Sequence, residues 1–461
     1  METFGWETAF ACTLAVSSVM LFSRWLRGPS REWLLTAVSA VVLFLWQPLA
    51  LLITLALAGV TWLGLPPAPR ISLGTTVALL VGTLAGFKYA PWLFLRLGGH
   101  SPFTTQPVAW VVPLGLSFTV FRLVGVVLDV NALRITLPLS RLALLSLFFP
   151  TLPAGPITTV RSLRISDEGQ EHWARWVRAG WRIMQGMSRK VLMADPLYEF
   201  LVGPWLKSGV GGLEPYQCFV LPVFFGLYIY WDFAGYSDIA IGMALLLGYQ
   251  VPENFNRPYS SRNLIEFWRR WHITLSEWIW SRLMVKMAGR RATTWRLCGA
   301  TMASMILCGI WHGTGLGYLV WGVWHGIGLV GVHLFSEARR RNPTFCSLTQ
   351  RVLGDTASLI LTFAFVTVGW TFFFLSPTEA VSIMSKSLQW RAGGSGASLY
   401  VPLAVVVGLL TAHWGGDHLE ARWRALPPFL HMSARAVLLA ILAYVMALTN
   451  AGRQDFCYVQ F

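Results

Sequence analysis

Residues 219–247 read FVLPVFFGLYIYWDFAGYSDIAIGMALLL, a run that is apolar almost throughout and contains no basic residue. About 20 such residues cross a hydrocarbon layer of roughly 30 Å as an α-helix, so the run is long enough to span a membrane. It also contains two carboxylates, Asp232 and Asp238, six residues apart. Ionisable groups at membrane depth are costly and by default mark a function. The run therefore predicts a membrane-spanning helix in a functionally important part of the chain.

The composition of the whole chain agrees with this prediction. Of its 461 residues, 55% are hydrophobic and only 12% are charged, and the mean hydropathy is +0.55. Soluble domains carry about 25% charged residues, so this chain lacks the charge that a water-facing surface needs. These values exclude a soluble enzyme, a disordered chain and a small disulfide scaffold. They predict an all-α polytopic membrane protein with on the order of ten membrane segments. The apolar runs lie near residues 8–24, 33–65, 73–97, 107–130, 139–160, 216–248, 299–335, 355–376, 398–413 and 433–450.

Positive charge gathers between the apolar runs. The chain has 36 Lys and Arg residues against 21 Asp and Glu residues, a net charge of +15. Basic loops set membrane topology and contact anionic lipid headgroups, so no nucleic-acid partner is needed to explain the charge. The uncharged loop 98–107 is expected on the outer side of the membrane. The basic clusters are expected on the cytoplasmic side and occupy residues 24–31, 161–190, 257–296, 339–351 and 422–435.

Two segments that contain proline predict interrupted helices. The run 33–65 is too long for one span and contains Pro48, which predicts two helices or one kinked helix. A single crossing at residues 139–160 would place the arginines before and after it on opposite sides of the membrane, although all of them favour the same side. A re-entrant element at Phe149–Pro156, with three prolines and one glycine, resolves the conflict. Such broken backbone is tolerated only inside protein or beside a water-filled cavity.

His312 is the sharpest candidate for a catalytic residue. It follows the apolar stretch 303–310 and precedes Gly313, Gly315 and Gly317. Its imidazole is therefore expected deep in the membrane beside a flexible turn, open from both aqueous sides. A neutral histidine can take a proton from a hydroxyl near neutral pH. The alternative is a core histidine whose ring is satisfied by a carbonyl group.

His272 lies in the aromatic and basic stretch Phe267–Ser276. It is predicted to orient the substrate or the first histidine, and the alternative is an interfacial histidine among Trp anchors. His325 and His333 are expected to serve packing or headgroup contacts. These two residues and His312 have spacings of 13 and 8 with no acidic residue beside them, so no metal site is predicted.

The two carboxylates of the apolar run have a structural interpretation. Asp232 and Asp238 are expected to pair with Arg269, Arg270 or backbone amides, because an unpaired carboxylate there would be very costly. They do not resemble the paired acids of glycosidases, because no polar cleft sequence surrounds them.

The segment that follows the run adds amides and arginines. Asn254 and Asn256 belong to the stretch PENFNRP at 252–258 and are also assigned a structural role. The arginines of this region either hold a phosphate-bearing donor at the cytoplasmic face or form a cluster that only sets topology. They are Arg257, Arg262, Arg269 and Arg270.

Four ordered motifs resemble those of the membrane-bound O-acyltransferase family: DFAGYSD at 232–238, PENFNRP at 252–258, FWRRWHITLS at 267–276 and GIWHG at 309–313. Weaker similarities are PLGLSF at 113–118 and FPTLPAGP at 149–156. The resemblance covers residues 113–335 and the extreme C-terminus. It points to the branch with the alginate O-acetyltransferase membrane subunit of bacteria and the D-alanyl transfer protein of teichoic acid modification.

The resemblance implies one acyltransferase domain over residues 1–461, built as a bundle of about a dozen transmembrane and re-entrant helices with opposed funnels. It places His312 at the family's signature histidine and His272 at its second polar position. The chain departs from the pattern at Arg122, where this branch often has glutamine. It also departs at residues 288–291, which read AGRR in place of the usual GGNR.

The last residues, FCYVQF at 456–461, resemble an F-x-Y-x-x-F ending found on this branch. In that ending the tyrosine is thought to receive the acyl group. Tyr458 is therefore a candidate acyl relay, and the alternative is an aromatic anchor at the membrane interface.

Together these features predict a multi-pass O-acyltransferase of the bacterial inner membrane. A thioester donor, acetyl-CoA or an acyl carrier protein, enters from the cytoplasm as a substrate, and no bound cofactor is expected. His312 acts as general base on a hydroxyl of Tyr458 or of a partner. An extracytoplasmic glycan acyltransferase then passes the group, taken to be acetyl, to a polysaccharide. The rival functions are a transporter or flippase of a lipid-linked glycan, which the lack of an internal repeat disfavours, and a non-catalytic membrane scaffold.

Overall fold

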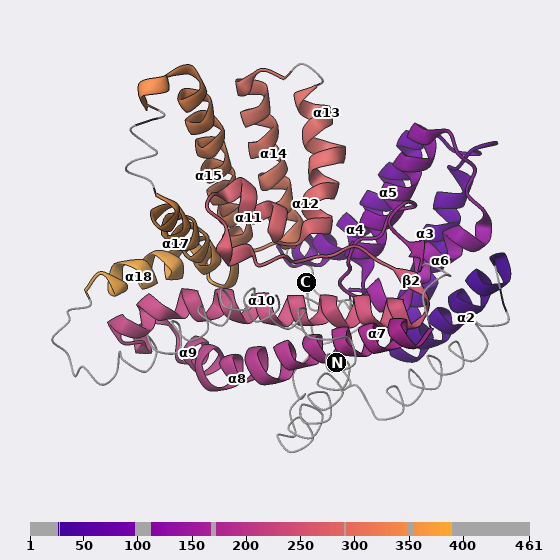
Figure 1. Ribbon diagram of the computed structural model, residues 1–461, viewed down its shortest axis with the longest axis horizontal. Coiled ribbons are helices and arrows are strands. Elements are labelled where there is room, and N and C mark those ends of the chain that lie inside the picture. Colours follow the sequence, from indigo (N-terminus) through magenta and orange to yellow (C-terminus); the bar gives the residue numbers. More distant parts are fainter. Residues whose placement is uncertain are drawn as a thin grey trace. The chain divides into compact units, whose positions relative to one another are not determined.

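The structure is a computed structural model that describes residues 28–96, 112–166, 172–289, 292–345 and 354–389, together with residues 26 and 347 (Figure 1). Helices dominate these residues, and the strands found in them are the two-residue β1 (Arg164–Ile165) and β2 (Tyr249–Gln250), which pair antiparallel. The predicted all-α membrane fold is confirmed. Within the described residues, five helices are long and apolar enough to cross a membrane: Leu73–Phe94, Leu116–Leu133, Pro215–Leu246, Leu316–Arg341 and Asp355–Phe374.

The chain divides into two compact units. The first unit comprises residues 1–186 and 236–253, and the second comprises residues 187–235 and 254–461. Helix α10 (Pro215–Leu246), which contains the run that opened the sequence analysis, contributes to both units.

The first unit begins with two helices joined at Pro48, so the prediction of an interruption there is confirmed. α2 ends at Trp46 and α3 begins at Pro48, since proline lacks the amide hydrogen of a helix interior but fits the first helical position. Between the helices, the Gln47 side chain accepts a hydrogen bond from the Leu114 amide at 2.6 Å. Among the described residues of this unit, the helices besides the end of α10 are α2 (Pro29–Trp46), α3 (Pro48–Leu63), α4 (Leu73–Arg96), α5 (Leu116–Leu133), α6 (Leu139–Leu147) and α7 (His172–Ser188).

The proline-rich segment after α6 is irregular and fully buried, as predicted for broken backbone. A single 3₁₀ turn, η1 (Phe149–Thr151), is followed by non-helical residues. Arg122 of α5 donates hydrogen bonds to this segment and to the end of α6. Its Nη1 donates to the Leu145 carbonyl at 2.9 Å, and its Nη2 donates to the Thr151 carbonyl at 2.8 Å and to the Thr151 hydroxyl at 3.0 Å. The residue that departs from the family pattern thus holds the broken segment in place.

Helix α7 packs closely on the end of α10 in the first unit. A Cβ at Gly242 would lie 2.6 Å from Ile183 and 2.8 Å from the Ala179 carbonyl, so only glycine permits this approach. Arg182, on the same helix, lies 2.6 Å from the Asp238 carboxylate and also pairs with Glu253. One arginine therefore ties α7 to a carboxylate of the apolar helix.

The second unit contains the long helices of the C-terminal half. Asn263, Thr293 and Ser376 begin α11, α14 and α18, and each side chain accepts a backbone N–H of the first turn. α14 and α15 lie side by side, and α17 packs against α15 (Figure 1). In the part of this unit that the structure describes, the elements besides the start of α10 are the π-helical turns η2 (Arg189–Ala194), η3 (Tyr198–Val202) and η6 (Trp280–Met284), the 3₁₀ turns η4 (Val210–Gly212) and η5 (Pro258–Ser260), and the α-helices α8 (Asp195–Leu197), α9 (Gly203–Ser208), α11 (Leu264–Arg270), α12 (Ile273–Ile279), α13 (Val285–Ala288), α14 (Thr294–His312), α15 (Leu316–Arg341), α17 (Asp355–Phe374) and α18 (Pro377–Ser387).

Glycines allow α14 and α15 to approach closely. A Cβ at Gly322 would lie 2.5 Å from the Met305 carbonyl, and a Cβ at Gly309 would lie 2.4 Å from the Tyr318 carbonyl. Glycine at these two positions therefore makes the contact between the helices possible. The close approach fixes the end of α14, where His312 lies.

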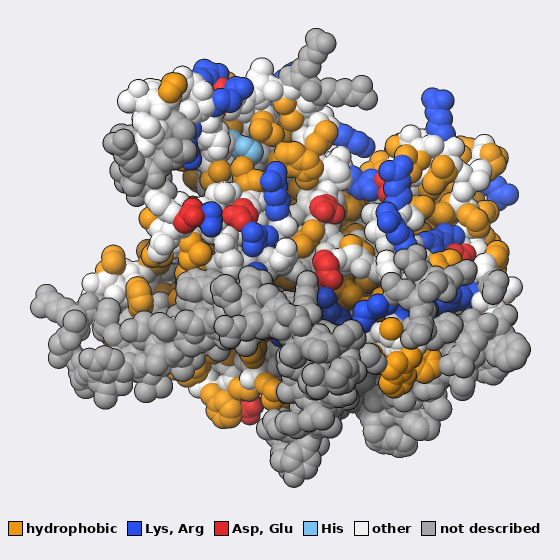
Figure 2. Space-filling model, in the orientation of Figure 1, with side chains coloured by type: hydrophobic (Ala, Val, Ile, Leu, Met, Phe, Trp, Pro, Cys, Tyr) orange, Lys and Arg blue, Asp and Glu red, His pale blue; other side chains and the backbone are white. Residues whose placement is uncertain are grey.

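Large apolar side chains are exposed on helices of both units. On α17, for example, Ile360 and Leu361 face outward, and on α3 Leu52 does so. In the space-filling view, hydrophobic side chains reach the surface over much of the drawn face, and a group of Lys and Arg side chains lies at the end of α15 (Figure 2). Apolar exposure on this scale suits a lipid environment.

Candidate functional site

His312 is the last residue of α14 and is almost completely covered, at 3% exposure. Four aromatic rings surround its imidazole. The centroid of Trp311 lies at 4.5 Å, that of Phe373 at 4.9 Å, that of Trp321 at 5.1 Å and that of Tyr318 at 6.1 Å. The imidazole is therefore held in an apolar aromatic setting.

Gly313 is needed because of the ring of Tyr318. A Cβ at position 313 would lie 2.6 Å from this ring, which stacks on His312 at an interplanar angle of 27°. A thioester and a hydroxyl can reach the imidazole only if rings such as Tyr318 move aside. Access to His312 from both aqueous sides, predicted from the sequence, stays a prediction.

His272 has a strained backbone and a fixed hydrogen-bond partner. It begins α12 at φ 42°, in the left-handed region that few non-glycine residues adopt. Its Nδ1 lies 3.0 Å from Oδ1 of Asn254, and this oxygen also accepts a hydrogen bond from the Thr274 hydroxyl at 2.9 Å. Because a carbonyl oxygen only accepts, the Nδ1 of His272 must carry the proton. Strain of this kind is often retained at functional sites.

Burial keeps the imidazole of His272 uncharged. The side chain is fully covered, and the ring of Phe233 packs edge-on against it with the centroids 4.8 Å apart. His272 lies outside the five candidate spans, and its burial lowers its pKa to about 3. The Nδ1-protonated, neutral ring leaves the lone pair of Nε2 as an acceptor.

An aromatic path links the surroundings of the two histidines within the second unit. Trp271, next to His272 in the chain, lies 4.9 Å from Trp370 between ring centroids. Trp370 stacks on Trp321 at 6.3 Å, and Trp321 contacts His312. The structure thus places both predicted histidines in one aromatic core.

The carboxylates of α10 have other partners than expected. We expected Asp232 and Asp238 to pair with Arg269 or Arg270, but the ion pairs found are with Lys190 and Arg182. Both partners precede α10 in the chain, on α7 and on the π-helical turn η2 that continues it. The sequence placed Lys190 only at the end of a basic cluster, and nothing in its local pattern marked it as buried.

Lys190 in fact serves two buried carboxylates. Its Nζ lies 2.8 Å from Oδ1 of Asp232 and 2.8 Å from Oδ1 of Asp195. Burial lowers the pKa of Lys190, but the charge of Asp232 and hydrogen bonds to both aspartates raise it by more, so the pKa is raised overall. Burial raises the pKa of Asp195, and its contact with Lys190 offsets only part of this effect. The cluster ties η2 and α8 to α10 beside Phe233.

Two of the four candidate donor-binding arginines are engaged in ion pairs. Arg262 lies 3.0 Å from Asp355, and Arg270 lies 2.6 Å from Glu266. Arg269 is exposed, and Arg257 has a left-handed backbone at φ 47°. Donor binding by these residues therefore stays a prediction.

Asn256 helps to hold the loop that carries Asn254. The backbone amide of Asn256 donates to the Arg270 carbonyl at 2.9 Å, which closes the loop that presents Asn254 to His272. Tyr458 lies outside the described residues. Among the residues that the structure describes, no group of three or more His, Cys, Asp or Glu side chains could hold a metal ion.

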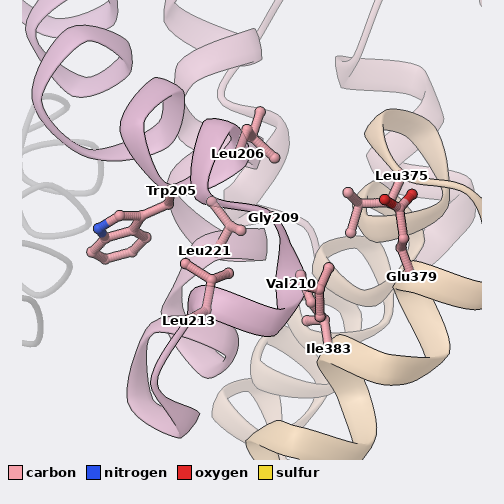
Figure 3. Close-up of a pocket in the computed structure, with 9 residues that line it drawn as sticks. All are labelled: Trp205, Leu206, Gly209, Val210, Leu213, Leu221, Leu375, Glu379 and Ile383. Carbon is pink, nitrogen blue, oxygen red and sulfur yellow. The ribbon is translucent and has the colours of Figure 1, made fainter.

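A pocket in the second unit lies away from these residues. It is lined by Trp205, Leu206, Gly209, Val210, Leu213, Leu221, Leu375, Glu379 and Ile383 (Figure 3). Its carboxylate, Glu379, is engaged in capping α18, where it accepts hydrogen bonds from the amide and hydroxyl of Ser376. None of the predicted site residues lines this pocket, so it does not serve as the candidate site.

Comparison with known proteins places this geometry in a family. Residues 112–375, which include His272 and His312, match the sequence profile of the membrane-bound O-acyltransferase family, MBOAT. The chain is 31% identical to the probable alginate O-acetylase AlgI of Pseudomonas putida, over 95% of this chain and 96% of the relative.

Two other relatives are named for different acceptors. The chain is 31% identical to a peptidoglycan O-acetyltransferase of Helicobacter pylori, over 56% of this chain and 47% of the relative. It is 27% identical to the teichoic acid D-alanyltransferase of Bacillus subtilis, over 65% of this chain and 77% of the relative. The chain is therefore an all-α membrane protein that belongs to the membrane-bound O-acyltransferase family.

Proposed function

We propose that this acyltransferase moves an acyl group from a thioester to a hydroxyl, with His312 as the general base. The observation that supports the role most strongly is the position of His312, buried among aromatic rings at the end of α14 and within the region that matches the family. A low-dielectric setting favours the neutral imidazole, which is the form that accepts a proton.

The reaction balances with one histidine. His312 takes the proton of the acceptor hydroxyl as its oxygen bonds to the thioester carbon. The carbon–sulfur bond then breaks, and the leaving thiolate takes the proton from the imidazolium. His272 is proposed to orient the donor or to stabilise the developing oxyanion, in the tautomer that Asn254 imposes.

The proposal also names the acyl group, its donor and its acceptor. The acyl group is proposed to be acetyl, because a relative that the chain matches over 95% of its own length and 96% of the relative's length is named an acetylase. The donor is acetyl-CoA or an acyl carrier protein, reaching the site from the cytoplasm across a bacterial inner membrane that the chain spans several times. Tyr458 or a partner's hydroxyl accepts the group, and an extracytoplasmic acyltransferase passes it to a polysaccharide. Family membership favours this scheme over a flippase or a scaffold.

The test compares two histidine variants of the full chain in membranes supplied with radiolabelled acetyl-CoA. His312→Ala should lower the formation of hydroxylamine-sensitive acetyl ester by about 10²- to 10⁴-fold, the usual contribution of a general base. His333→Ala is the matched control. His333 lies on α15, with its Nε2 3.4 Å from the Thr301 hydroxyl, and its variant should retain transfer. Transfer at the wild-type level by a well-folded His312→Ala protein would refute the role.

A second comparison addresses the acceptor. In the same assay, Tyr458→Phe should abolish label on the chain itself if Tyr458 is the relay. Label that persists on the chain in this variant would exclude Tyr458 as the labelled group and indicate another acceptor on the chain, whereas a wild-type chain that stays unlabelled while a partner is labelled would leave the partner's hydroxyl as the acceptor.

A further inference from the structure

Two guanidinium groups of the first unit lie over one buried phenol ring. The Cζ of Arg31, in the first turn of α2, lies 5.3 Å from the ring centroid of Tyr249 in β2, and the Cζ of Arg141 in α6 lies 5.9 Å from it. Arg31 also donates to the Leu247 carbonyl at 2.9 Å, and a Cβ at Gly248 would overlap its guanidinium. The ring and the turn before it therefore hold two positive charges at one place.

The hydroxyl of Tyr249 has no hydrogen-bond partner among the residues that the structure describes, although the side chain is 0% exposed. The Nε of Arg31 is likewise buried without such a partner. A neighbouring carboxylate, Glu32, is already engaged, since Arg141 donates to it at 3.2 Å and Ser140 donates to it at 2.7 Å. Buried polar atoms are normally bonded, and both of these atoms can donate, so an oxygen acceptor would satisfy them.

Helix α7 adds positive charge to the same place. Burial lowers the pKa of Arg175, and the charges of Arg31 and Arg178 lower it further. Arg175 is half-buried and Arg178 is exposed, so this side of the group can be reached from outside. Like charges brought together in a partly buried setting disfavour one another unless an anion offsets them. The residues Arg31, Arg141, Arg175, Arg178 and Tyr249 are called here the arginine–tyrosine cluster.

The helices that carry the cluster also expose tryptophan. Trp33 of α2 is 46% exposed, and Trp173 of α7 is 61% exposed. Exposed tryptophan in a membrane protein is typical of the level of the lipid headgroups. The basic segments 24–31 and 161–190, which contain three of the four arginines, are expected on the cytoplasmic side, where anionic lipids attract such charge. The surroundings therefore favour a lipid over a soluble anion.

We propose that the arginine–tyrosine cluster binds the phosphate group of an anionic glycerophospholipid. Guanidinium groups donate to phosphate oxygens in pairs, and the phenol hydroxyl supplies a further donor. The phosphate offsets the clustered positive charge, and the exposed tryptophans offer apolar surface to the lipid. Because guanidinium groups lie over the ring of Tyr249, Arg31 or Arg141 shifts on the ring when the phosphate enters. All these residues belong to the first unit, and the inference does not depend on acyl transfer.

The test measures the Kd of fluorescent phosphatidylglycerol on the full chain in neutral detergent, with no acyl donor present. Tyr249→Phe keeps the ring and removes the hydroxyl, and should raise Kd by about 10-fold, the value of a hydrogen bond to a charged group. Arg175→Gln should raise Kd by about 5-fold, the value of one arginine near anionic lipid. Arg134→Gln is the matched control, because Arg134 is exposed, follows α5 and carries the same charge, and it should leave Kd unchanged.

Thermal stability provides the second readout. Tyr249→Phe should leave Tm in neutral detergent unchanged or raise it, because the hydroxyl that it removes is buried without a partner in the described part of the chain. Added phosphatidylglycerol should raise the Tm of wild type more than that of Tyr249→Phe, because a ligand stabilises the folded state in proportion to its affinity. A variant with lowered Tm and unchanged Kd would overturn the proposal, since the hydroxyl would then be structural.

Further comparisons identify the ligand. Phosphatidylcholine with the same acyl chains should bind more weakly than phosphatidylglycerol, because its choline group cancels the phosphate charge, and equal affinity would overturn the requirement for an anionic lipid. Phosphatidylglycerol that stays bound in excess inorganic phosphate or CoA supports a lipid site. Displacement by either soluble compound would assign the cluster to a soluble phosphate and overturn the proposal. An equal loss of affinity in Arg134→Gln would overturn it as an effect of net charge.

Discussion

Replacing Arg122 tests how the broken segment after α6 is held. The guanidinium is 0% exposed and donates three hydrogen bonds, to the Leu145 carbonyl and to the carbonyl and hydroxyl of Thr151. Arg122→Met keeps much of the side-chain volume and removes all three donors. Arg122→Gln keeps one amide group, whose shorter side chain reaches one carbonyl at most.

The expected loss follows from these contacts. Without Arg122 the Leu145 carbonyl loses its side-chain donor, which destabilises the fold by about 1–3 kcal/mol, whereas the Thr151 carbonyl keeps a hydrogen bond from the Gly155 amide at 3.0 Å. The two lost bonds to the carbonyl and hydroxyl of Thr151 add about 0.5–1.5 kcal/mol each, for a total of roughly 2–6 kcal/mol. Removing the buried cation recovers part of this, so we expect Arg122→Met to lose about 2–4 kcal/mol and Arg122→Gln to lose about half as much. On the scale of 150–250-residue domains, where 1 kcal/mol shifts Tm by roughly 2–4 °C, Arg122→Met should lower Tm by about 4–16 °C.

The assay is thermal unfolding of the solubilised full chain, followed by loss of the monodisperse peak in size-exclusion chromatography. Arg134→Met is the matched control, since Arg134 follows α5 directly and is exposed. A surface change of this kind should shift stability by less than about 0.5 kcal/mol. If Arg122→Met proved as stable as wild type, the burial of the cation would cost as much as its hydrogen bonds contribute, and the argument would fail.

Three further predictions concern the candidate site. Lys190→Met leaves Asp232 and Asp195 without their shared cation and should destabilise the chain by about 3–5 kcal/mol, and adding Asp232→Asn should restore part of the loss in the same thermal assay. Asn254→Leu removes the acceptor that fixes the His272 tautomer and should lower acetyl transfer by about 10-fold or more, so unchanged transfer would show that the tautomer is unimportant. Burial lowers the pKa of His272 from 6.5 to about 3, so the unfolded chain takes up this proton at a higher pH than the folded chain does. The free energy of unfolding of the wild type should therefore fall as the pH falls from 6.5 towards 3. His272→Asn should lose less stability over this range in pH-dependent Tm measurements.

Much of the fold could be predicted from local sequence. Apolar runs of sufficient length indicated a membrane protein, and Pro48 indicated the break between α2 and α3, because these features act on the few residues around them. The proline-rich stretch after α6 indicated broken backbone for the same reason. The ordered motifs around His272 and His312 indicated the family, which comparison with known proteins confirms.

The partners of the buried charges could not be predicted in this way. The sequence paired Asp232 and Asp238 with arginines that follow them, whereas the structure pairs them with Lys190 and Arg182, which precede them. His325 was expected to serve packing or headgroup contacts, and no pattern in its own helix indicates that it lies fully buried between the rings of Trp268 and Trp321. These contacts join residues far apart in the chain.

The sequence by itself determined the solvent in which this protein folds, where its helices break and which histidine is the candidate base. Hydrophobicity and backbone restriction are properties of single residues and short runs, so they can be read from the order of residues. Only the tertiary structure decided that Arg122 donates hydrogen bonds to the broken segment and that Asn254 sets the tautomer of His272. Hydrogen bonds and ion pairs depend on distances of about 3 Å between side chains, and packing, not sequence spacing, sets those distances.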